Sequence, residues 1–306
     1  VRVVTPGTLT DTALLSDKSE AMLLAVHQAP RNRVGLAWLA LTQSQLHLAE
    51  CSQDELPAWL ARISPAELML SEEASEIFGQ RIQQFTAQQG AVLTRRAAWN
   101  FDSALGAHKL NAQLGTASLQ SFGAQDLDAA HAAAAALLAY AEHTQGQALA
   151  HVQGLRVERA GELMDLPVAT QRNLELVKTL RGEDSPTVFS LLDTCQTGMG
   201  SRLLKSWLLS PQRDRSAAQT RLNAIDALRA GEWKKLREQL KGASDVERIT
   251  ARIALGQVRP RELVGLHQTL QKCDLLTQHL RRLDANFANI SEHLTPPADV
   301  AALLGR

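Results

Sequence analysis

The chain has 306 residues, of which 45% are hydrophobic and 21% charged, and its 32 basic side chains balance 32 acidic ones. This composition is typical of a globular protein and excludes extensive disorder. No apolar run approaches the roughly 20 residues that a membrane-spanning helix needs, and the first residues show no secretion signal. We expect a cytoplasmic protein of two domains that makes no membrane contact.

Charge is divided unevenly between the two halves of the chain. Residues 1–154 contain 9 Lys and Arg against 14 Asp and Glu, a net charge of −5, and residues 155–306 contain 23 against 18, a net charge of +5. A protein that binds DNA strongly usually has a larger excess of basic residues, concentrated on one face. We therefore expect little strong DNA binding by this chain alone.

The first part of the chain predicts a linker followed by a sheet. Residues 1–17 begin with an alternating strand, "VRVV", and continue with a "TPGT" turn and a polar stretch. Three antiparallel strands are expected within residues 21–51, separated by breaks at 30–32 and 42–45.

The next elements alternate between helix and strand. We expect a helix over residues 52–62, a strand over 66–70, a helix over 77–88 and a strand over 91–97. Ser52 and Glu55 have the spacing of a capping box at the start of the first helix. Such an order predicts a mixed sheet with helices on its faces.

Two further helices are predicted before a domain boundary. The helix over residues 103–114 is expected to turn three leucines inward, Leu105, Leu110 and Leu114, and three polar residues outward, His108, Lys109 and Gln113. An alanine-rich run over 126–143 strongly favours helix and permits close packing. Turn residues and the change in charge place the boundary at 146–154, and a small hairpin is expected over 155–166.

The second half is organised around residues 166–211, which predict three short helices separated by glycines. The available N-caps are Thr170, Ser185 and Thr197 or Ser201. In the last of these helices we expect Arg202 and Lys205 to face away from an inward apolar stripe. The stripe consists of Met199, Leu203, Leu204, Trp207 and Leu208.

Amphipathic helices continue to the end of the chain. They are expected over residues 216–228, 232–240, 245–255 and 261–283, with a break at "TPPA" over 295–298 and a short helix after it. Their apolar stripes are predicted to form the core. These stripes include Leu222, Ile225 and Leu228, then Val246, Ile249 and Ile253.

Several segments carry a family resemblance. They are "RNLEL" at residues 172–176, "SLLDTCQTGMGSRLLKSWLLSP" at 190–211, "ERITARIALGQVRPRELVGL" at 247–266, "VRVVTPGTLTDTALL" at 1–15 and "LNAQLGTASLQSFG" at 110–123. The first three resemble the core (lever) domain of the bacterial MutS family of DNA mismatch-repair proteins. The fourth resembles the segment that leaves the family's mismatch-binding domain, and the fifth resembles part of its connector domain.

The resemblance implies an α+β chain in which a ribonuclease-H-like connector domain of mixed α/β structure precedes a mainly α-helical core domain. The expected division is a linker from the mismatch-binding domain at residues 1–17, the connector at 18–146 and the first part of the core at 147–306. On this reading the chain is a piece of a longer protein.

The resemblance also implies a function in DNA mismatch repair and the DNA damage response. The whole protein is expected to recognise mismatched double-stranded DNA as a homodimer, to bind and hydrolyse ATP with magnesium through another domain, and to recruit the partner MutL. The chain itself is expected to be no enzyme and to act as a structural relay and docking scaffold. His108, Lys109 and Gln113 are the implied MutL contacts, and an ordinary solvated helix face is the alternative for each.

No motif in the chain predicts catalysis, a cofactor or a metal site. Gly198-Met199-Gly200 lacks the preceding strand and the later Gly-Lys-Ser/Thr of a phosphate-binding loop. The family's connector often has Asp where this chain has Ala40, and Glu72 and Glu73 are adjacent, so they point to opposite faces and are expected to be solvated. Metal-assisted hydrolysis needs several converging oxygen ligands.

The remaining candidates have unremarkable alternatives. The three cysteines are widely separated and form no CxxC pair, so we expect small buried thiols at Cys51, Cys195 and Cys273. The basic residues that could reach DNA phosphates, or be solvated instead, are Arg202, Lys205, Arg213, Arg215, Lys234, Lys235 and Arg237. Two other functions stay open, a stand-alone ribonuclease-H-like nuclease and a helical adaptor.

Overall fold

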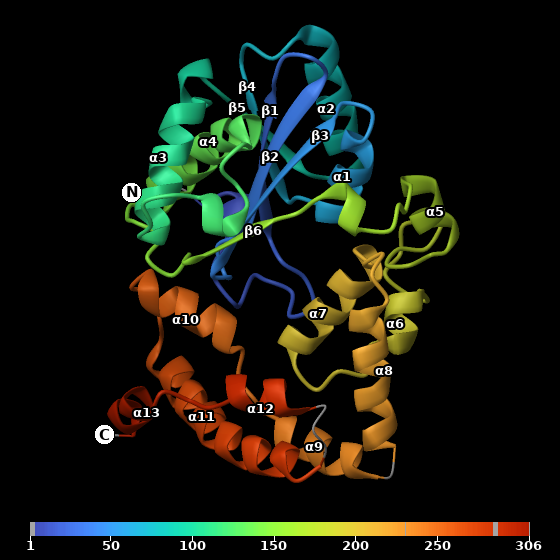
Figure 1. Cartoon of the computed structure of the whole chain (residues 1–306), viewed down its shortest axis with the longest axis vertical. Helices are drawn as coiled ribbons and strands as arrows, with labels where there is room; N and C mark the ends of the chain where they lie inside the picture. Colours follow the sequence, from blue (N-terminus) through green and yellow to red (C-terminus); the bar gives the residue numbers. More distant parts are fainter. Residues whose placement is uncertain (1–3, 230, 284–286, 306) are drawn as a thin grey trace.

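Figure 1 shows a computed structural model of the chain, which describes residues 4–229, 231–283 and 287–305. A sheet with helices on both faces forms the first half, and a region of helices forms the second. The predicted fold class, α+β with a mixed sheet followed by a helical region, is confirmed. Most of the predicted "VRVV" strand, residues 1–3, lies outside the described residues.

The sheet has six strands in the order β5-β4-β1-β2-β3-β6. They are β1 (Met22–Gln28), β2 (Arg33–Ala40), β3 (Gln45–Ser52), β4 (Glu67–Ser71), β5 (Val92–Arg96) and β6 (Gly154–Val157). The first three pair antiparallel, as predicted, and the other three each pair parallel with a neighbour. Because β6 pairs with β3 and is followed by a 3-10 turn, the predicted hairpin over 155–166 is wrong.

Helices cover both faces of this sheet. Helices α1 (Leu56–Ile63) and α2 (Glu76–Gln89) pack on one face, and α3 (Ser103–Leu114) and α4 (Asp128–Gln145) on the other (Figure 1). Successive side chains of a strand point to opposite faces, so alternate residues of β1 enter two separate apolar cores. The Ser52–Glu55 capping box forms as predicted, although α1 itself begins at Leu56.

Helix α4 lies unusually close to its neighbours. A Cβ atom at Gly35 of β2 would lie 1.9 Å from the Ala129 carbonyl oxygen, and one at Gly106 of α3 would lie 1.9 Å from the His131 carbonyl oxygen. The alanines of α4 and these two glycines therefore permit backbone approach that no larger residue would allow.

Residues 5–8, predicted as linker, are fastened to the sheet through Glu67. This residue is fully buried in β4, and its carboxylate accepts hydrogen bonds from the backbone N–H of Gly7 (3.1 Å) and the hydroxyl of Tyr140 (2.7 Å). The hydroxyl groups of Thr5 and Thr94 also donate to it. A buried carboxylate requires such partners, so the N-terminal segment is part of the fold.

The helical region has a small apolar core of its own, which includes Leu236, Leu276, Leu280 and Phe287. Its helices are α5 (Val168–Asn173), α6 (Val188–Leu192), α7 (Gly198–Leu209), α8 (Ser216–Leu228), α9 (Glu232–Leu240), α10 (Val246–Ala254), α11 (Pro260–Arg281), α12 (Ala288–His293) and α13 (Ala298–Leu304). None of the helices in the described part is long and apolar enough to cross a membrane.

Several predicted orientations are wrong, most of them in the second half. Leu203 and Trp207 of α7 are 51% and 40% exposed, whereas Arg202 is buried. The other residues predicted inward but found exposed are Leu105, Cys195, Leu222, Ile225 and Ile253. Thr197 caps α7 as predicted, but α5 and α6 begin after Pro167 and Thr187, not after Thr170 and Ser185.

Candidate functional site

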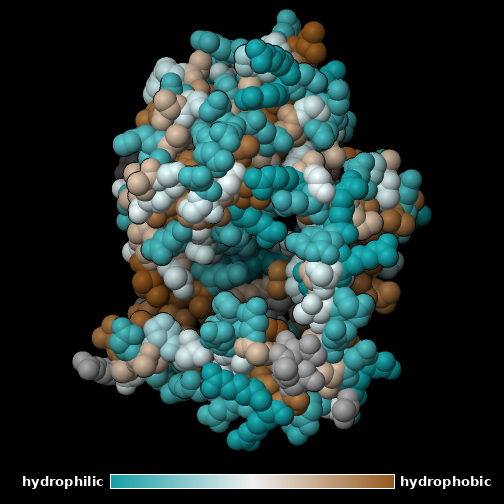
Figure 2. Space-filling model, in the orientation of Figure 1, coloured by the Kyte–Doolittle hydropathy of each residue, from teal (hydrophilic) through white to brown (hydrophobic). Residues whose placement is uncertain are grey.

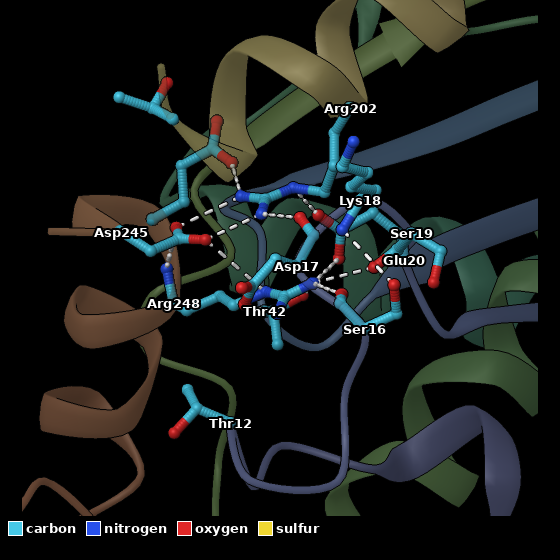
Figure 3. A network of polar contacts seen from close by, with 12 residues as sticks. Thr12, Ser16, Asp17, Lys18, Ser19, Glu20, Thr42, Arg202, Asp245 and Arg248 are labelled. Carbon is cyan, nitrogen blue, oxygen red and sulfur yellow. Dashed lines mark hydrogen bonds and ion pairs between the residues drawn. The ribbon is translucent and has the colours of Figure 1, made fainter. Parts of the chain in front are cut away.

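A cluster of buried charges joins the N-terminal segment to two helices of the second half (Figure 3). Helix α7 begins at Thr197, whose hydroxyl accepts from the Gly200 N–H at 3.1 Å. A Cβ atom at Gly198 would lie 2.7 Å from the Asp17 carbonyl oxygen. Gly198 is therefore explained by close packing against the N-terminal segment.

Arg202 of α7 lies at the centre of this cluster. Its guanidinium donates to both carboxylate oxygens of Asp245, at 2.6 and 3.0 Å, and to Glu247 at 2.7 Å, and it forms an ion pair with Glu20. Burial disfavours the charged guanidinium, but these three carboxylates outweigh that effect and raise the pKa of Arg202 above its usual value. Asp245 also caps α10, accepting from the Arg248 N–H at 3.2 Å.

Arg248 of α10 binds the same N-terminal segment. Its side chain donates to the carbonyl oxygens of Ser16 (2.8 Å) and Ser19 (2.7 Å). It also lies 4.0 Å from the carboxylate of Glu20. Burial raises the pKa of Glu20. The hydrogen bond from Thr42 and the charges of Arg202 and Arg248 lower it, but burial has the larger effect.

A second set of contacts lies one turn further along α10. Arg252 donates to the carbonyl oxygen of Thr10 and to the carboxylate of Glu262, both at 3.1 Å. Arg259 pairs with Asp11 at 3.0 Å. We call Arg202, Arg248, Arg252 and their partners the junction network. It ties residues 10–20 to α7, α10 and α11.

The junction network is suited to holding segments together. Its buried arginines donate to carboxylates and carbonyl groups and form ion pairs, and removing one partner of a buried ion pair typically costs about 3–5 kcal/mol. Within residues 4–229, 231–283 and 287–305, no three His, Cys, Asp or Glu side chains are grouped as metal ligands.

The three predicted MutL contacts have different surroundings. His108 is exposed on α3. Lys109 is half-buried and pairs with Glu142 of α4 at 2.9 Å. The Gln113 amide donates to the carbonyl oxygens of Leu149 and Val152, at 2.8 and 2.7 Å. Gln113 is therefore engaged in holding the chain between α4 and β6, and His108 and Lys109 are the better candidates for docking.

Other predicted residues lie apart from one another. Glu72 and Glu73 are exposed, as expected, and Ala40 is buried in the sheet. Arg202 is not available to DNA phosphates because its donors are used in the junction network. Arg213 and Arg237 each donate to a backbone carbonyl oxygen, of Leu163 and Thr194 respectively.

No pattern in the sequence pointed to Arg248 and Arg252. Both lie in a stretch whose helical period predicted only its apolar residues, Val246, Ile249 and Ile253, to face inward. The acceptors of Arg248 lie at least 229 residues away along the chain, so no local pattern connects them.

The structure defines a fold in which an α/β sheet region and a helical region are joined by buried ion pairs. Family models of MutS domain II and MutS domain III match residues 21–153 and 169–305. The chain belongs to the MutS family, and the matches correspond to its connector and core domains. This membership associates the chain with DNA mismatch repair, and neither matched domain is an ATPase domain.

Proposed function

We propose that the chain is the connector and core part of a cytoplasmic DNA mismatch-repair protein and acts there as a relay and docking scaffold without catalysis of its own. The supporting observation is the junction network, which ties residues 10–20, outside both matched domains, to α7, α10 and α11. A change of position at the N-terminal segment is thereby transmitted to the core helices. The division at residues 18–146 and 147–306 is part of this proposal.

The proposal extends to the whole protein that such a relay would serve. That protein recognises mismatched double-stranded DNA as a homodimer, binds and hydrolyses ATP with magnesium in a separate domain, and recruits MutL. The chain contributes the α3 surface with His108 and Lys109 to MutL docking. On this surface His108 is exposed, and Lys109 is half-buried beside Glu142.

Binding of the chain to purified MutL, followed by biolayer interferometry, tests the docking role. The double variant His108→Ala/Lys109→Met should raise the Kd at least about fivefold, since it removes one charge and one ring from a contact surface, where important residues contribute more than about 1 kcal/mol. Lys109 forms a partly exposed ion pair of about 0–1 kcal/mol, so the variant should still fold.

Arg81→Met is the matched control, because Arg81 is an exposed cation of α2 on the other face of the sheet. It should leave the Kd unchanged. Equal affinities of MutL for the wild type and the double variant would exclude this α3 surface as the docking site.

A further inference from the structure

A cavity of about 620 Å³ lies beside the junction network, between the sheet and helices α7 and α8. Figure 2 shows the surface hollowed between the two regions, with hydrophilic residues in the hollow. Arg62 of α1 and Arg156 of β6 line it from the sheet region, and Lys205 and Arg221 line it from α7 and α8. Its volume is in the range of small-molecule sites, roughly 300–1,000 Å³.

The carboxylates that line this cavity are already engaged. Glu20 and Glu247 pair with Arg202, and Glu158 lies 2.9 Å from His47. By contrast, no carboxylate of the described residues forms an ion pair with the four cations named above. The cavity lining therefore carries six Lys and Arg side chains against three Glu side chains, with cations on both walls.

Two of these cations are partly removed from water, and the charges of nearby carboxylates, Glu158 and Asp165 for Arg62 and Asp184 for Lys205, offset this only in part. The Nε atom of Arg62 is buried and makes no hydrogen bond, while its guanidinium lies over the Trp59 ring at 5.0 Å. Burial also lowers the pKa of the Lys205 ammonium. Removing a charged or polar group from water is costly unless it is paired, so a bound anion would relieve both.

Arg221 is held in place on the other wall. Its guanidinium lies 3.8 Å from the centre of the Trp207 ring, within cation–π distance. Guanidinium groups bind phosphate oxygens through paired N–H donors, and two arginines stand across from a lysine and a third arginine. An ion carrying several phosphate oxygens offers acceptors to cations on both walls.

We propose that this cavity is a binding site for a small phosphate-bearing anion of the pyrophosphate type, held between Arg62 and Arg156 on one wall and Lys205 and Arg221 on the other. Such an anion strengthens the connection between the sheet region and α7–α8. Because the sheet region bounds the cavity on one side and α7 and α8 bound it on the other, it suits a compact ion better than an extended nucleic-acid strand.

Isothermal titration of the 306-residue chain with inorganic pyrophosphate at low ionic strength tests this site. Saturable binding of one ion per chain is expected. Lys205→Gln and Arg156→Gln, one from each wall, should each weaken it at least about tenfold, because each removes a charge-assisted hydrogen bond. Lys234→Gln, which removes an exposed cation outside the cavity, should bind as the wild type does.

A thermal shift measurement separates a lost site from a damaged fold. Pyrophosphate should raise the Tm of the wild type and of Lys234→Gln, because a ligand that binds only the folded state stabilises it, and this rise should be clearly smaller in Lys205→Gln at the same pyrophosphate concentration. The proposal is overturned if pyrophosphate fails to bind, if Lys205→Gln and Lys234→Gln bind equally, or if only a single-stranded ten-nucleotide DNA binds.

Discussion

At the scale of single residues, the junction network shows how completely a polar side chain can enter a protein interior once its partners are supplied. Arg248 is 1% exposed, and the carbonyl groups of Ser16 and Ser19 replace its hydration. The two arginines also offset the desolvation of Glu20, which burial would otherwise protonate more readily. Each of these charges depends on the others being present.

Replacing Arg248 therefore has a large predicted cost. Arg248→Met keeps much of the side-chain volume but leaves two carbonyl groups unsatisfied and Glu20 less compensated, so we expect a loss of about 3–5 kcal/mol in the free energy of unfolding. Urea denaturation followed by circular dichroism measures it. Arg229→Met removes a highly exposed arginine paired with Asp226 and should change the same quantity by less than about 0.5 kcal/mol. Equal effects would show that burial of Arg248 contributes nothing.

At the scale of elements, the contact between α3 and α4 depends on Gly106. Alanine has the better helix propensity by about 1 kcal/mol, so Gly106→Ala would stabilise an isolated helix. In the protein, its methyl group would overlap the His131 carbonyl oxygen, and overpacking costs about 1–3 kcal/mol or more. We expect the overlap to dominate and the Tm to fall.

Gly79→Ala in α2 is the matched control for this prediction. Gly79 is also buried in a helix, but the nearest atom to its added methyl group, at 3.0 Å, is the end of the flexible Arg95 side chain. That side chain can move, so the Tm should stay the same or rise. A rise in Tm for Gly106→Ala as well would contradict the close contact between α3 and α4.

The elements also show which features a sequence can predict. Helices α3, α8 and α9 begin and end at the predicted residues, because helix propensity and capping are local properties. The sequence does not predict which faces of α7 and α10 are buried. Their apolar periods predict Leu203 and Ile253 inward, but acceptors near Asp17, 185 residues before Arg202 along the chain, draw the arginines inward instead. Ion pairs between distant segments leave no periodic pattern.

For the whole molecule, the carboxylates that join the regions determine how acid acts on the fold. Burial opposes the ionisation of Asp193 and Glu262. The contacts of Asp193 with Lys18 and Ser201 outweigh burial and lower its pKa from the ordinary 3.8. The contacts of Glu262 with Arg259 and Arg252 likewise lower its pKa from the ordinary 4.5. The pKa of Glu20 is raised instead, so protonation of Glu20 stabilises the folded state relative to the unfolded state. The backbone N–H of Ala13 and the charge of Arg259 also lower the pKa of Asp11. Three lowered carboxyl groups against one raised group predict a net loss of stability in acid.

A carboxyl group with a lowered pKa contributes stability that is fully present well above its unfolded pKa and is lost as the pH falls through its folded pKa. The free energy of unfolding should therefore decrease as the pH falls from about 5 to below 3. Asp193→Asn keeps an oxygen that can accept from Ser201 but cannot titrate, so its decrease should be shallower than that of the wild type. Urea unfolding at several pH values measures both slopes, with exposed Asp226→Asn as the control. If the slopes of wild type and Asp193→Asn coincide, Asp193 does not link the acid response to the contact between the N-terminal segment and the core helices.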